Sequence, residues 1–150
     1  FYAAYFSIRA KAFDLRIMTG DLKTQLTEFN RIKALDRAAS PKDKDLMSAL
    51  EVSMEMYQRG YRFINVDIQH SEARRFSIKD GALLPPFLAI DSLGETVADA
   101  IVAEREERPF TSLKDLQRRC KLSNTIIDLM KDLKCCGELP EDEQMSLFGA

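Results

Sequence analysis

The sequence has few residues of the kinds that hold metal ions or carry out acid–base chemistry. His70 is the only histidine in 150 residues, so there is no second imidazole for a zinc site or a general-base pair. The cysteines Cys120, Cys135 and Cys136 lack the spacing of metal ligands, and the adjacent pair cannot form a disulfide without strain. We therefore expect reduced thiols, a surface histidine, and no metal or other cofactor in this chain.

Long apolar runs are also missing. No stretch approaches the length of a bilayer-spanning helix, and the first residues lack the charged and then apolar layout of a signal peptide. These absences predict a cytoplasmic protein without membrane contact. The chain also lacks an initiator methionine and begins within an apolar, aromatic helical pattern at residues 1–9, which we interpret as a fragment of a longer protein.

A strong excess of either charge is absent too. The formal net charge is −2, from 22 basic and 24 acidic residues. Residues 138–150 hold four of the acidic residues and no base, so residues 1–137 contain 22 basic and 20 acidic groups. A protein that binds a polyanion mainly through lysine and arginine would be far more basic. Contact with a nucleic acid would therefore depend on oriented backbone amides and a few local bases.

The first 60 residues show helix starts with recognisable caps. Asp21 is a candidate N-cap for a helix whose apolar face would be formed by Leu22, Leu26, Phe29 and Ile32. Ser40 and Asp43 form a capping box around Pro41. The helix that follows is expected to end at Gly60, and its apolar stripe consists of Leu46, Met47, Leu50, Met54 and Tyr57.

Residues 61–82 have a different pattern that predicts a small sheet. Apolar and polar side chains alternate over residues 63–68, as in a short half-buried strand. Residues 74–78 predict a second strand, and Asp80 and Gly81 predict the turn after it. Arg74 and Arg75 are interpreted as a solvated face.

Residues 90–101 contain the most informative pattern. Ile90 and Leu93 are expected to anchor the chain in the core, and Gly94 to take the positive φ that a chain reversal needs. Apolar residues then recur at helical spacing, so a helix should start at Glu95 or Thr96. Amides at a helix start have no intrahelical partner and favour an anion. An ordinary helix turn without a ligand remains the alternative.

A second helix pair follows. Ser112 and Asp115 form a capping box for a short helix that buries Leu113 and Leu116, and residues 118–123 form a basic turn. A last helix is expected to start near Ser123, with inward side chains at Ile126, Ile127, Met130 and Leu133, and Gly137 follows it.

Residues 139–150 begin as an acidic, proline-containing linker that should be disordered. The chain then ends in an apolar cluster, which in a solvated tail usually marks a docking peptide. That candidate peptide consists of Gln144, Met145, Ser146, Leu147 and Phe148.

Both features resemble known recognition elements. The pattern Ile-x-x-Leu-Gly-x-x-x-Ala-x-x-Ile from Ile90 resembles the helix-hairpin-helix motif, whose members bind the backbone of duplex DNA without reading sequence; Ser92 stands where its common form has a first glycine. The two helix pairs look like a tandem unit whose second copy supports the fold more than it grips DNA. The pattern Gln-x-Ser-Leu-Phe at 144–148 resembles the pentapeptide by which bacterial replication proteins dock on the sliding clamp.

Taken together, the chain resembles the C-terminal part of the PolC-type DNA polymerase III alpha subunit. The similarity is carried by residues 1–9, 13–14, 59–67, 84–94, 110–118 and 144–148. The resemblance implies a mainly α fold with a small β element. It also implies four parts: a helical end of the fingers region (1–60), a short β connection (61–82), a tandem helix-hairpin-helix domain (83–138) and a flexible tail with a clamp-binding peptide (139–150).

The resemblance also implies partners and contact residues. The partners would be the backbone of double-stranded DNA, the bacterial sliding clamp, and the upstream palm and fingers of the polymerase. Phosphates would be held by the hairpin and by two bases of the second pair, namely Ser92, Leu93, Gly94, Glu95, Thr96, Arg119 and Lys121. Arg9, Lys11 and Arg16 would face the nucleotide or template, or form a solvated helix face; both readings stay open.

Catalysis would not belong to this segment. The family's nucleotidyl transfer uses two metal ions held by palm aspartates, which would lie upstream of Phe1, so Mg²⁺ is expected only there and the chain alone should be inactive. Two alternatives remain. The chain would be a helix-hairpin-helix repair or nuclease-type subunit with a clamp peptide, or an interaction module that does not bind DNA.

Overall fold

The structure is a computed structural model of the chain and describes residues 1–142. These residues are mainly helical, with one two-stranded antiparallel sheet, which confirms the predicted fold class. The elements in chain order are α1 (Tyr2–Ile8), the 3₁₀ turn η1 (Ala10–Ala12), α2 (Leu15–Met18), α3 (Leu22–Leu35), η2 (Asp36–Ala38), α4 (Pro41–Gln58), β1 (Ser77–Lys79), β2 (Ala82–Leu84), η3 (Phe87–Ala89), α5 (Glu95–Glu107), α6 (Leu113–Cys120) and α7 (Asn124–Asp132).

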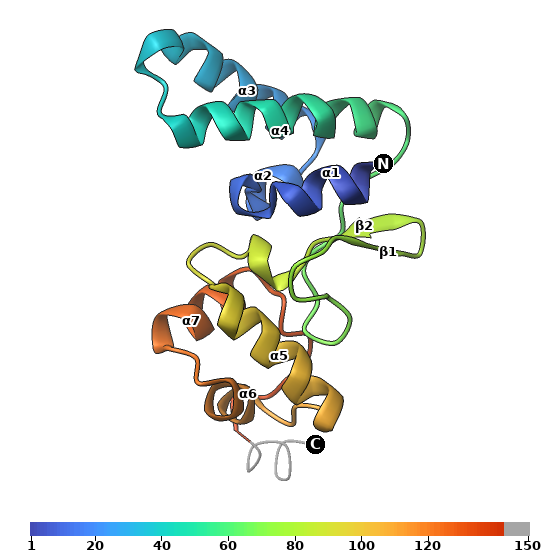
Figure 1. The fold of residues 1–150 in the computed structure, drawn as a ribbon, viewed down its shortest axis with the longest axis vertical. Helices are drawn as coiled ribbons and strands as arrows, with labels where there is room; N and C mark the ends of the chain where they lie inside the picture. The colour runs from blue at the N-terminus through green and yellow to red at the C-terminus, as the bar shows by residue number, and fades with distance from the viewer. Residues whose placement is uncertain (143–150) are drawn as a thin grey trace.

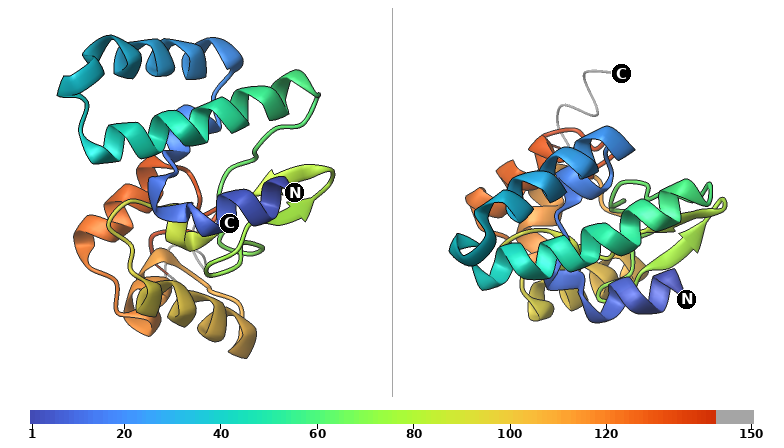
Figure 2. Two further views of the ribbon diagram at one scale, coloured as in Figure 1. Left: turned by 45° about the horizontal axis from the view of Figure 1, so that its top comes forward. Right: turned by 90° about the horizontal axis from the view of Figure 1, so that it is seen from above.

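The helices form three groups along the long axis of the molecule. Figure 1 shows α3 and α4 together at one end and α5, α6 and α7 at the other, with α1, α2 and the sheet between them. The two further views in Figure 2 keep α3 and α4 side by side, and these two helices pack against each other. The short segments η1 and η3 also pack together, which joins the N-terminal helices to the first hairpin.

The predicted start of α3 is confirmed, but the predicted buried face is wrong in part. The Asp21 carboxylate accepts a hydrogen bond from the backbone N–H of Thr24 at 2.8 Å. Leu22 and Leu26 are 37% and 50% exposed, whereas Gln25 is fully buried. The Gln25 amide donates to the Met18 carbonyl at 3.1 Å and accepts from the Ser53 hydroxyl at 2.7 Å. This polar contact with α4 is satisfied on both sides, so α3 turns Gln25 inward.

The predicted capping box of α4 is present. The Ser40 hydroxyl accepts from the Asp43 N–H at 3.0 Å, and the Asp43 carboxylate accepts from the Ser40 N–H at 3.1 Å. Gly60 has φ +91° just after the helix, as its predicted role as terminator requires. The buried stripe differs in detail from the predicted one, because Met54 is only half-buried. The buried residues of α4 are Leu46, Ala49, Leu50, Ser53 and Met56.

The predicted strand over residues 63–68 is wrong. β1 pairs with β2 across the Asp80–Gly81 turn, with Ile78 opposite Leu83. Phe63 forms only a single bridge to Leu83. Residues 63–68 instead act as a buried connector, since the Ile68 N–H donates to the Cys135 carbonyl at 2.9 Å. The apolar side chains of this connector therefore fill the core although its backbone is not part of a sheet.

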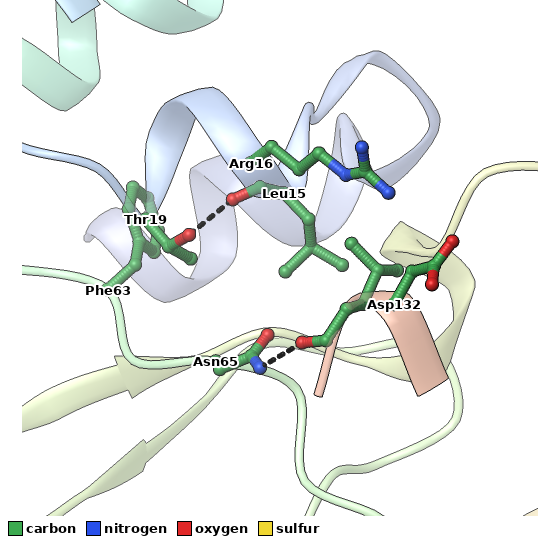
Figure 3. Close-up of a pocket in the computed structure, with 7 residues that line it drawn as sticks. Leu15, Arg16, Thr19, Phe63, Asn65 and Asp132 are labelled. Carbon is green, nitrogen blue, oxygen red and sulfur yellow. Dashed lines mark hydrogen bonds between the residues drawn. The ribbon is translucent and has the colours of Figure 1, made fainter. Parts of the chain in front are cut away.

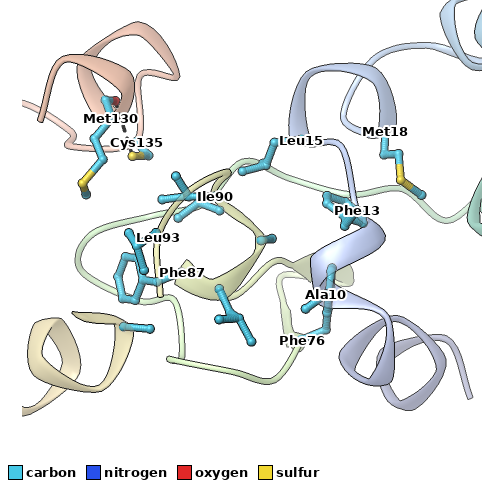
Figure 4. Packing of buried hydrophobic residues seen from close by; sticks show 14 of the residues in the cluster. Ala10, Phe13, Leu15, Met18, Phe76, Phe87, Ile90, Leu93, Met130 and Cys135 are labelled. Atoms are coloured by element: carbon cyan, nitrogen blue, oxygen red, sulfur yellow. Dashed lines mark hydrogen bonds between the residues drawn. The ribbon is translucent and has the colours of Figure 1, made fainter. Parts of the chain in front are cut away.

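One hydrophobic core runs from the N-terminal helices to the hairpins. Four phenylalanines, Phe6, Phe13, Phe63 and Phe76, form its aromatic part, and all of their ring centroids lie within 6.1 Å of one another. Figure 4 shows Phe13 and Leu15 approaching from one side and Ile90 and Leu93 from the other. The position of the first hairpin is therefore set by the N-terminal helices as well as by α5 and α7.

Candidate nucleic-acid interface

The first hairpin is a tight reversal between η3 and α5. The Ile90 N–H donates to the Phe87 carbonyl at 3.0 Å, and the Leu93 N–H donates to the Ile90 carbonyl at 3.2 Å. Ile90 and Leu93 are each 1% exposed, which confirms their predicted role as anchors. The element before the reversal is a single 3₁₀ turn and not a full helix. The core therefore holds the base of the hairpin and leaves Ser92 exposed at its tip.

The residue with positive φ is Ser92 and not Gly94, so this prediction was wrong. Ser92 has φ +65°. Gly94 has φ −81° and ψ 170°, an extended conformation open to any residue, and it is the N-cap of α5. The reversal takes place one residue before the buried Leu93, and the serine there adopts a left-handed conformation that costs about 1–2 kcal/mol for a residue with a side chain.

The start of α5 is open. The helix begins at Glu95, as the sequence predicts, and Gly94 supplies no side-chain cap. The first amides of α5, at Glu95 and Thr96, accordingly have no hydrogen-bond partner among residues 1–142. A Cβ atom added at Gly94 would meet no atom within 4 Å. Unpaired amides, the positive end of the helix dipole and empty space thus coincide at one exposed point.

The second hairpin repeats the first in backbone conformation. Lys121 has φ +56°, Leu122 is 6% exposed, and Ser123 is the N-cap of α7. The order of left-handed residue, buried leucine and N-cap matches that of Ser92, Leu93 and Gly94. The caps differ, because the Ser123 hydroxyl accepts from the Ile126 N–H at 3.2 Å. The start of α7 is therefore closed by its own side chain.

Arg119 joins α6 to the end of α5 and so links the two helix pairs. Its side chain is 8% exposed, and its guanidinium bonds the carboxylates of Glu104 and Asp115, both at 3.2 Å. It also donates to the carbonyls of Glu104, Arg108 and Pro109 at the end of α5. Burial lowers the pKa of Arg119, but these acidic partners outweigh burial and the pKa lies above its usual value. Its donors already have acceptors within the protein.

Asp115, on α6, is the buried carboxylate that binds Arg119. Its side chain is fully buried, and it accepts from the Thr111 N–H at 3.1 Å and from Arg119. Only half of the predicted capping box is present: the Asp115 N–H donates to the Ser112 hydroxyl at 2.9 Å, but the Asp115 carboxylate accepts from the Thr111 N–H in place of the Ser112 N–H. Burial raises the pKa of Asp115, but the Thr111 N–H and the Arg119 guanidinium outweigh it, and the pKa lies below its usual range.

Arg74 neutralises the acidic side of α5. It donates to the Asp99 carboxylate at 3.2 and 2.6 Å and lies 3.5 Å from Glu95. The hydrogen bond from Arg74 lowers the pKa of Asp99. Without this arginine, two carboxylates of the first two turns would stand unpaired beside the open amides. The sequence assigned Arg74 to a solvated face, and no local pattern links it to a helix that starts 21 residues later.

The beginning of the expected tail is tied to α6. The Leu113 N–H donates to the Pro140 carbonyl at 2.8 Å, and the Lys114 N–H donates to the Glu141 carbonyl at 3.1 Å. Lys131 pairs with Glu141 at 2.5 Å. The predicted disorder is thus wrong for residues 140–141. The candidate docking peptide, Gln144, Met145, Ser146, Leu147 and Phe148, lies outside the described residues.

Over residues 1–142, no three side chains of histidine, cysteine, aspartate or glutamate come together as a metal site. His70 is exposed, as expected, and its Nδ1 lies 2.6 Å from the Asp67 carboxylate. No helix in this part of the chain is both long and apolar enough to cross a membrane.

Comparison with known proteins gives a consistent relationship. The helix-hairpin-helix motif family matches residues 60–144. The chain is 41% identical over 148 residues to a PolC-type DNA polymerase III of Caldanaerobacter subterraneus subsp. tengcongensis, covering 99% of this chain and 11% of that protein. It is 43% identical over 150 residues to a PolC-type DNA polymerase III of Streptococcus suis, covering 99% of this chain and 10% of that protein. The chain thus spans about a tenth of the length of the curated relatives it matches.

Proposed function

We propose a duplex-holding role for this chain, which belongs to the helix-hairpin-helix family and corresponds over nearly its whole length to a segment of PolC-type DNA polymerase III. In this proposal it holds the duplex at the C-terminal end of such a polymerase. Its role is to keep the enzyme on DNA during replication in the bacterial cytoplasm. The contact is with the sugar-phosphate backbone and is independent of base sequence.

The open start of α5 is the observation that carries this proposal. A phosphate placed at Gly94 accepts from the amides of Glu95 and Thr96, which have no partner in the described residues. The Thr96 hydroxyl adds a donor, and the exposed Lys121 of the second hairpin supplies a positive charge. Ser92 forms the left-handed turn at the hairpin tip, and the buried Leu93 anchors that turn in the core. Because Arg119 is buried in its own contacts, we leave it out of the phosphate contacts.

Replacing Gly94 by serine tests the open helix start. The Gly94→Ser variant acquires the cap that Ser123 supplies in the second hairpin, so it folds with equal or slightly greater stability. Its hydroxyl, bonded like that of Ser123 to the amide three residues on, here Val97, stands in the open space before the first turn and takes the place of a phosphate oxygen there. Loss of even one hydrogen bond to a charged group, worth about 1.5–3 kcal/mol, weakens duplex binding about tenfold or more.

Ser123→Ala provides the matched control. It removes the cap of α7 and costs about 1 kcal/mol of stability, and it leaves the affinity for a fluorescent duplex near that of the parent chain. Unchanged duplex binding by a folded Gly94→Ser variant would count against the proposal and favour a hairpin that only supports the fold. A chain that binds no duplex at all would leave the interaction-module alternative.

The second half of the proposal is clamp docking through the last residues. In the pentapeptide, Leu147 and Phe148 fill an apolar pocket of the sliding clamp and Gln144 hydrogen-bonds beside it, while Met145 and Ser146 connect them. Weak DNA and clamp contacts on one chain then reinforce each other through effective concentration. A chain truncated before Gln144 should lose clamp binding and keep duplex binding. Clamp binding that survives this truncation would overturn the assignment.

Nucleotide addition takes place outside this chain. The metal-binding aspartates of the palm, with their Mg²⁺, belong to the upstream part of the polymerase in this proposal, together with the surfaces on which the fingers pack. The chain alone is expected to add no nucleotides to a primed template, and also to cut no DNA. Cleavage of duplex DNA by the purified chain would favour the alternative of a repair or nuclease-type subunit.

A further inference from the structure

A hollow lies between the N-terminal helices and the first hairpin. It has a volume of about 410 Å³ and lies against Ser92 and Asp91 on the hairpin side. Three cations line the opposite side, namely Lys11 of η1, Arg16 of α2 and Lys42 of α4. A second hollow of about 560 Å³ adjoins it and shares Lys11 and Lys42. All three cations are exposed.

Lys11 is tied directly to the hairpin. Its ammonium donates to the Leu93 carbonyl at 3.1 Å, joining residues 82 positions apart in the sequence. Ala10, directly before Lys11, and Phe13, two residues after it, are buried in the core, so the backbone around Lys11 is held in place. An ammonium has three N–H donors. One is given to Leu93, and two remain for a ligand beside the hairpin tip.

Lys42 and Arg16 form no ion pair within residues 1–142, unlike most arginines of the hairpin region. Of the acids on this side, Asp14 already caps α2 by accepting from the Ile17 N–H at 3.1 Å. Asp91 and, in the adjoining hollow, Asp45 remain. Together the two hollows are lined by four cations, Lys11, Arg16, Lys42 and Arg9, and by three acids, which leaves an excess of one positive charge. Arg16 and Lys42 have no ion-pair partner within the described residues.

The position of Lys42 has no explanation in stability. It is the second residue of α4, directly after Pro41. A positive charge in the first turn of a helix faces the positive end of the dipole and destabilises the helix. The capping box of Ser40 and Asp43 is complete without it. Neither the helix cap nor an ion pair within residues 1–142 accounts for a cation at this place.

Figure 3 shows the surroundings of Arg16 on the side away from Lys11's hollow, where one acid lines the same hollow as Arg16. Arg16 on α2 and Asp132 at the end of α7 flank a further hollow of about 630 Å³, and Asn65 closes its floor by donating to the Leu133 carbonyl at 2.7 Å. Arg16 lines both this hollow and the one beside Ser92. It thus stands at the border of the two.

We infer that Lys11, Lys42 and Arg16 extend the phosphate-binding surface of the first hairpin onto the N-terminal helices, so that one duplex backbone contacts both. This inference rests on the proposed duplex binding. For Lys11 and Arg16, whose two alternatives from the sequence were a nucleotide- or template-facing side and a solvated helix face, it assigns contact with the duplex backbone, and it adds Lys42 of α4 to them.

The decisive variant is Lys42→Met, because Lys42 has no partner within residues 1–142 whose loss would disturb the fold. Duplex affinity should fall several-fold, and the slope of log affinity against log salt should become shallower by about 0.9 for the lost phosphate contact. The thermal midpoint should stay the same or rise, because an unfavourable charge leaves the helix start. A merely structural lysine would lower the midpoint and leave the slope unchanged.

Two further variants complete the test. Lys11→Met should weaken binding more than Lys42→Met, because it also frees the Leu93 carbonyl and with it the hairpin tip. Lys23→Met, on α3 and outside both hollows, is the control for removal of one charge. If the parent chain binds duplex and Lys42→Met matches Lys23→Met in affinity and slope, the inference fails while the proposed function stands. If the parent chain binds no duplex, both fail.

Discussion

Ser92 and Lys121 occupy the same position in two hairpins that share no glycine there. Each is left-handed, with φ of +65° and +56°, and each precedes a buried leucine and then the N-cap of the following helix. The backbone of the tandem unit is therefore repeated more faithfully than its sequence. The two copies differ in what they offer a phosphate. The first has an uncapped helix start, and the second has an exposed cation.

Replacing either left-handed residue with glycine should stabilise the chain. Glycine adopts positive φ without the cost of about 1–2 kcal/mol that a side chain brings, less the larger entropy that glycine loses on folding. Ser92→Gly and Lys121→Gly should each raise the free energy of unfolding by up to about 1 kcal/mol in urea titrations. Only Lys121→Gly should weaken duplex binding. A lower stability for both variants would mean that their side chains make contacts beyond the backbone turn.

Asp115 should control the stability of the chain in acid. Its pKa in the folded state is lowered, so its contribution is complete above the unfolded value near 3.9 and is lost as pH falls through the folded value. Asp115→Asn breaks a buried ion pair with Arg119 and should cost about 3 kcal/mol at pH 7. The difference from the parent chain should shrink below about pH 4. A difference that stays constant from pH 7 to pH 3 contradicts this assignment.

The dependence of duplex binding on salt should be shallow. Four cations face the proposed backbone path, and each neutralised phosphate contributes about −0.9 to the log–log slope, which gives about −3.6 at most. Amides carry no charge and add nothing to it. Fluorescence anisotropy between about 50 and 200 mM salt measures the slope. A slope much steeper than about −4 would require many more lysine and arginine contacts than this surface offers.

The place at which the tail is cut should decide whether the chain stays stable. Ending the chain before Gln144 keeps the carbonyls of Pro140 and Glu141 on the first amides of α6. Ending it after Gly137 removes both hydrogen bonds and should cost about 1–3 kcal/mol, at about 0.5–1.5 kcal/mol each. Differential scanning calorimetry of the two truncations compares them directly. Equal midpoints would show that water replaces these carbonyls without loss.

Local signals made much of the helical structure predictable. The caps at Asp21, Ser40 and Ser123 are each formed with an amide three residues further on, so the sequence alone places three helix starts correctly. The start of α5 at Glu95 and the buried anchors Ile90 and Leu93 were predicted on the same basis. These features depend only on neighbours within one or two turns of helix.

Features that depend on distant partners were missed. Gln25 faces inward because Met18 and Ser53 satisfy its amide, and alternation over residues 63–68 predicts a strand although only Phe63 finds a bridge. The positive φ was placed at Gly94, since glycine is the usual residue for it, and not at Ser92. At the candidate interface, the contact of Lys11 with Leu93 has no signal in either segment alone.

The four-phenylalanine cluster sets an order of events during synthesis on the ribosome. Phe6 and Phe13 are made before their ring partners Phe63 and Phe76, and the last of these follows Phe13 by 63 positions in the sequence. At about 5–20 residues per second, this interval lasts about 3–13 seconds. The cluster of four rings can be completed only after this interval. The nascent chain is therefore most exposed to chaperones and to aggregation before its first hairpin has been translated.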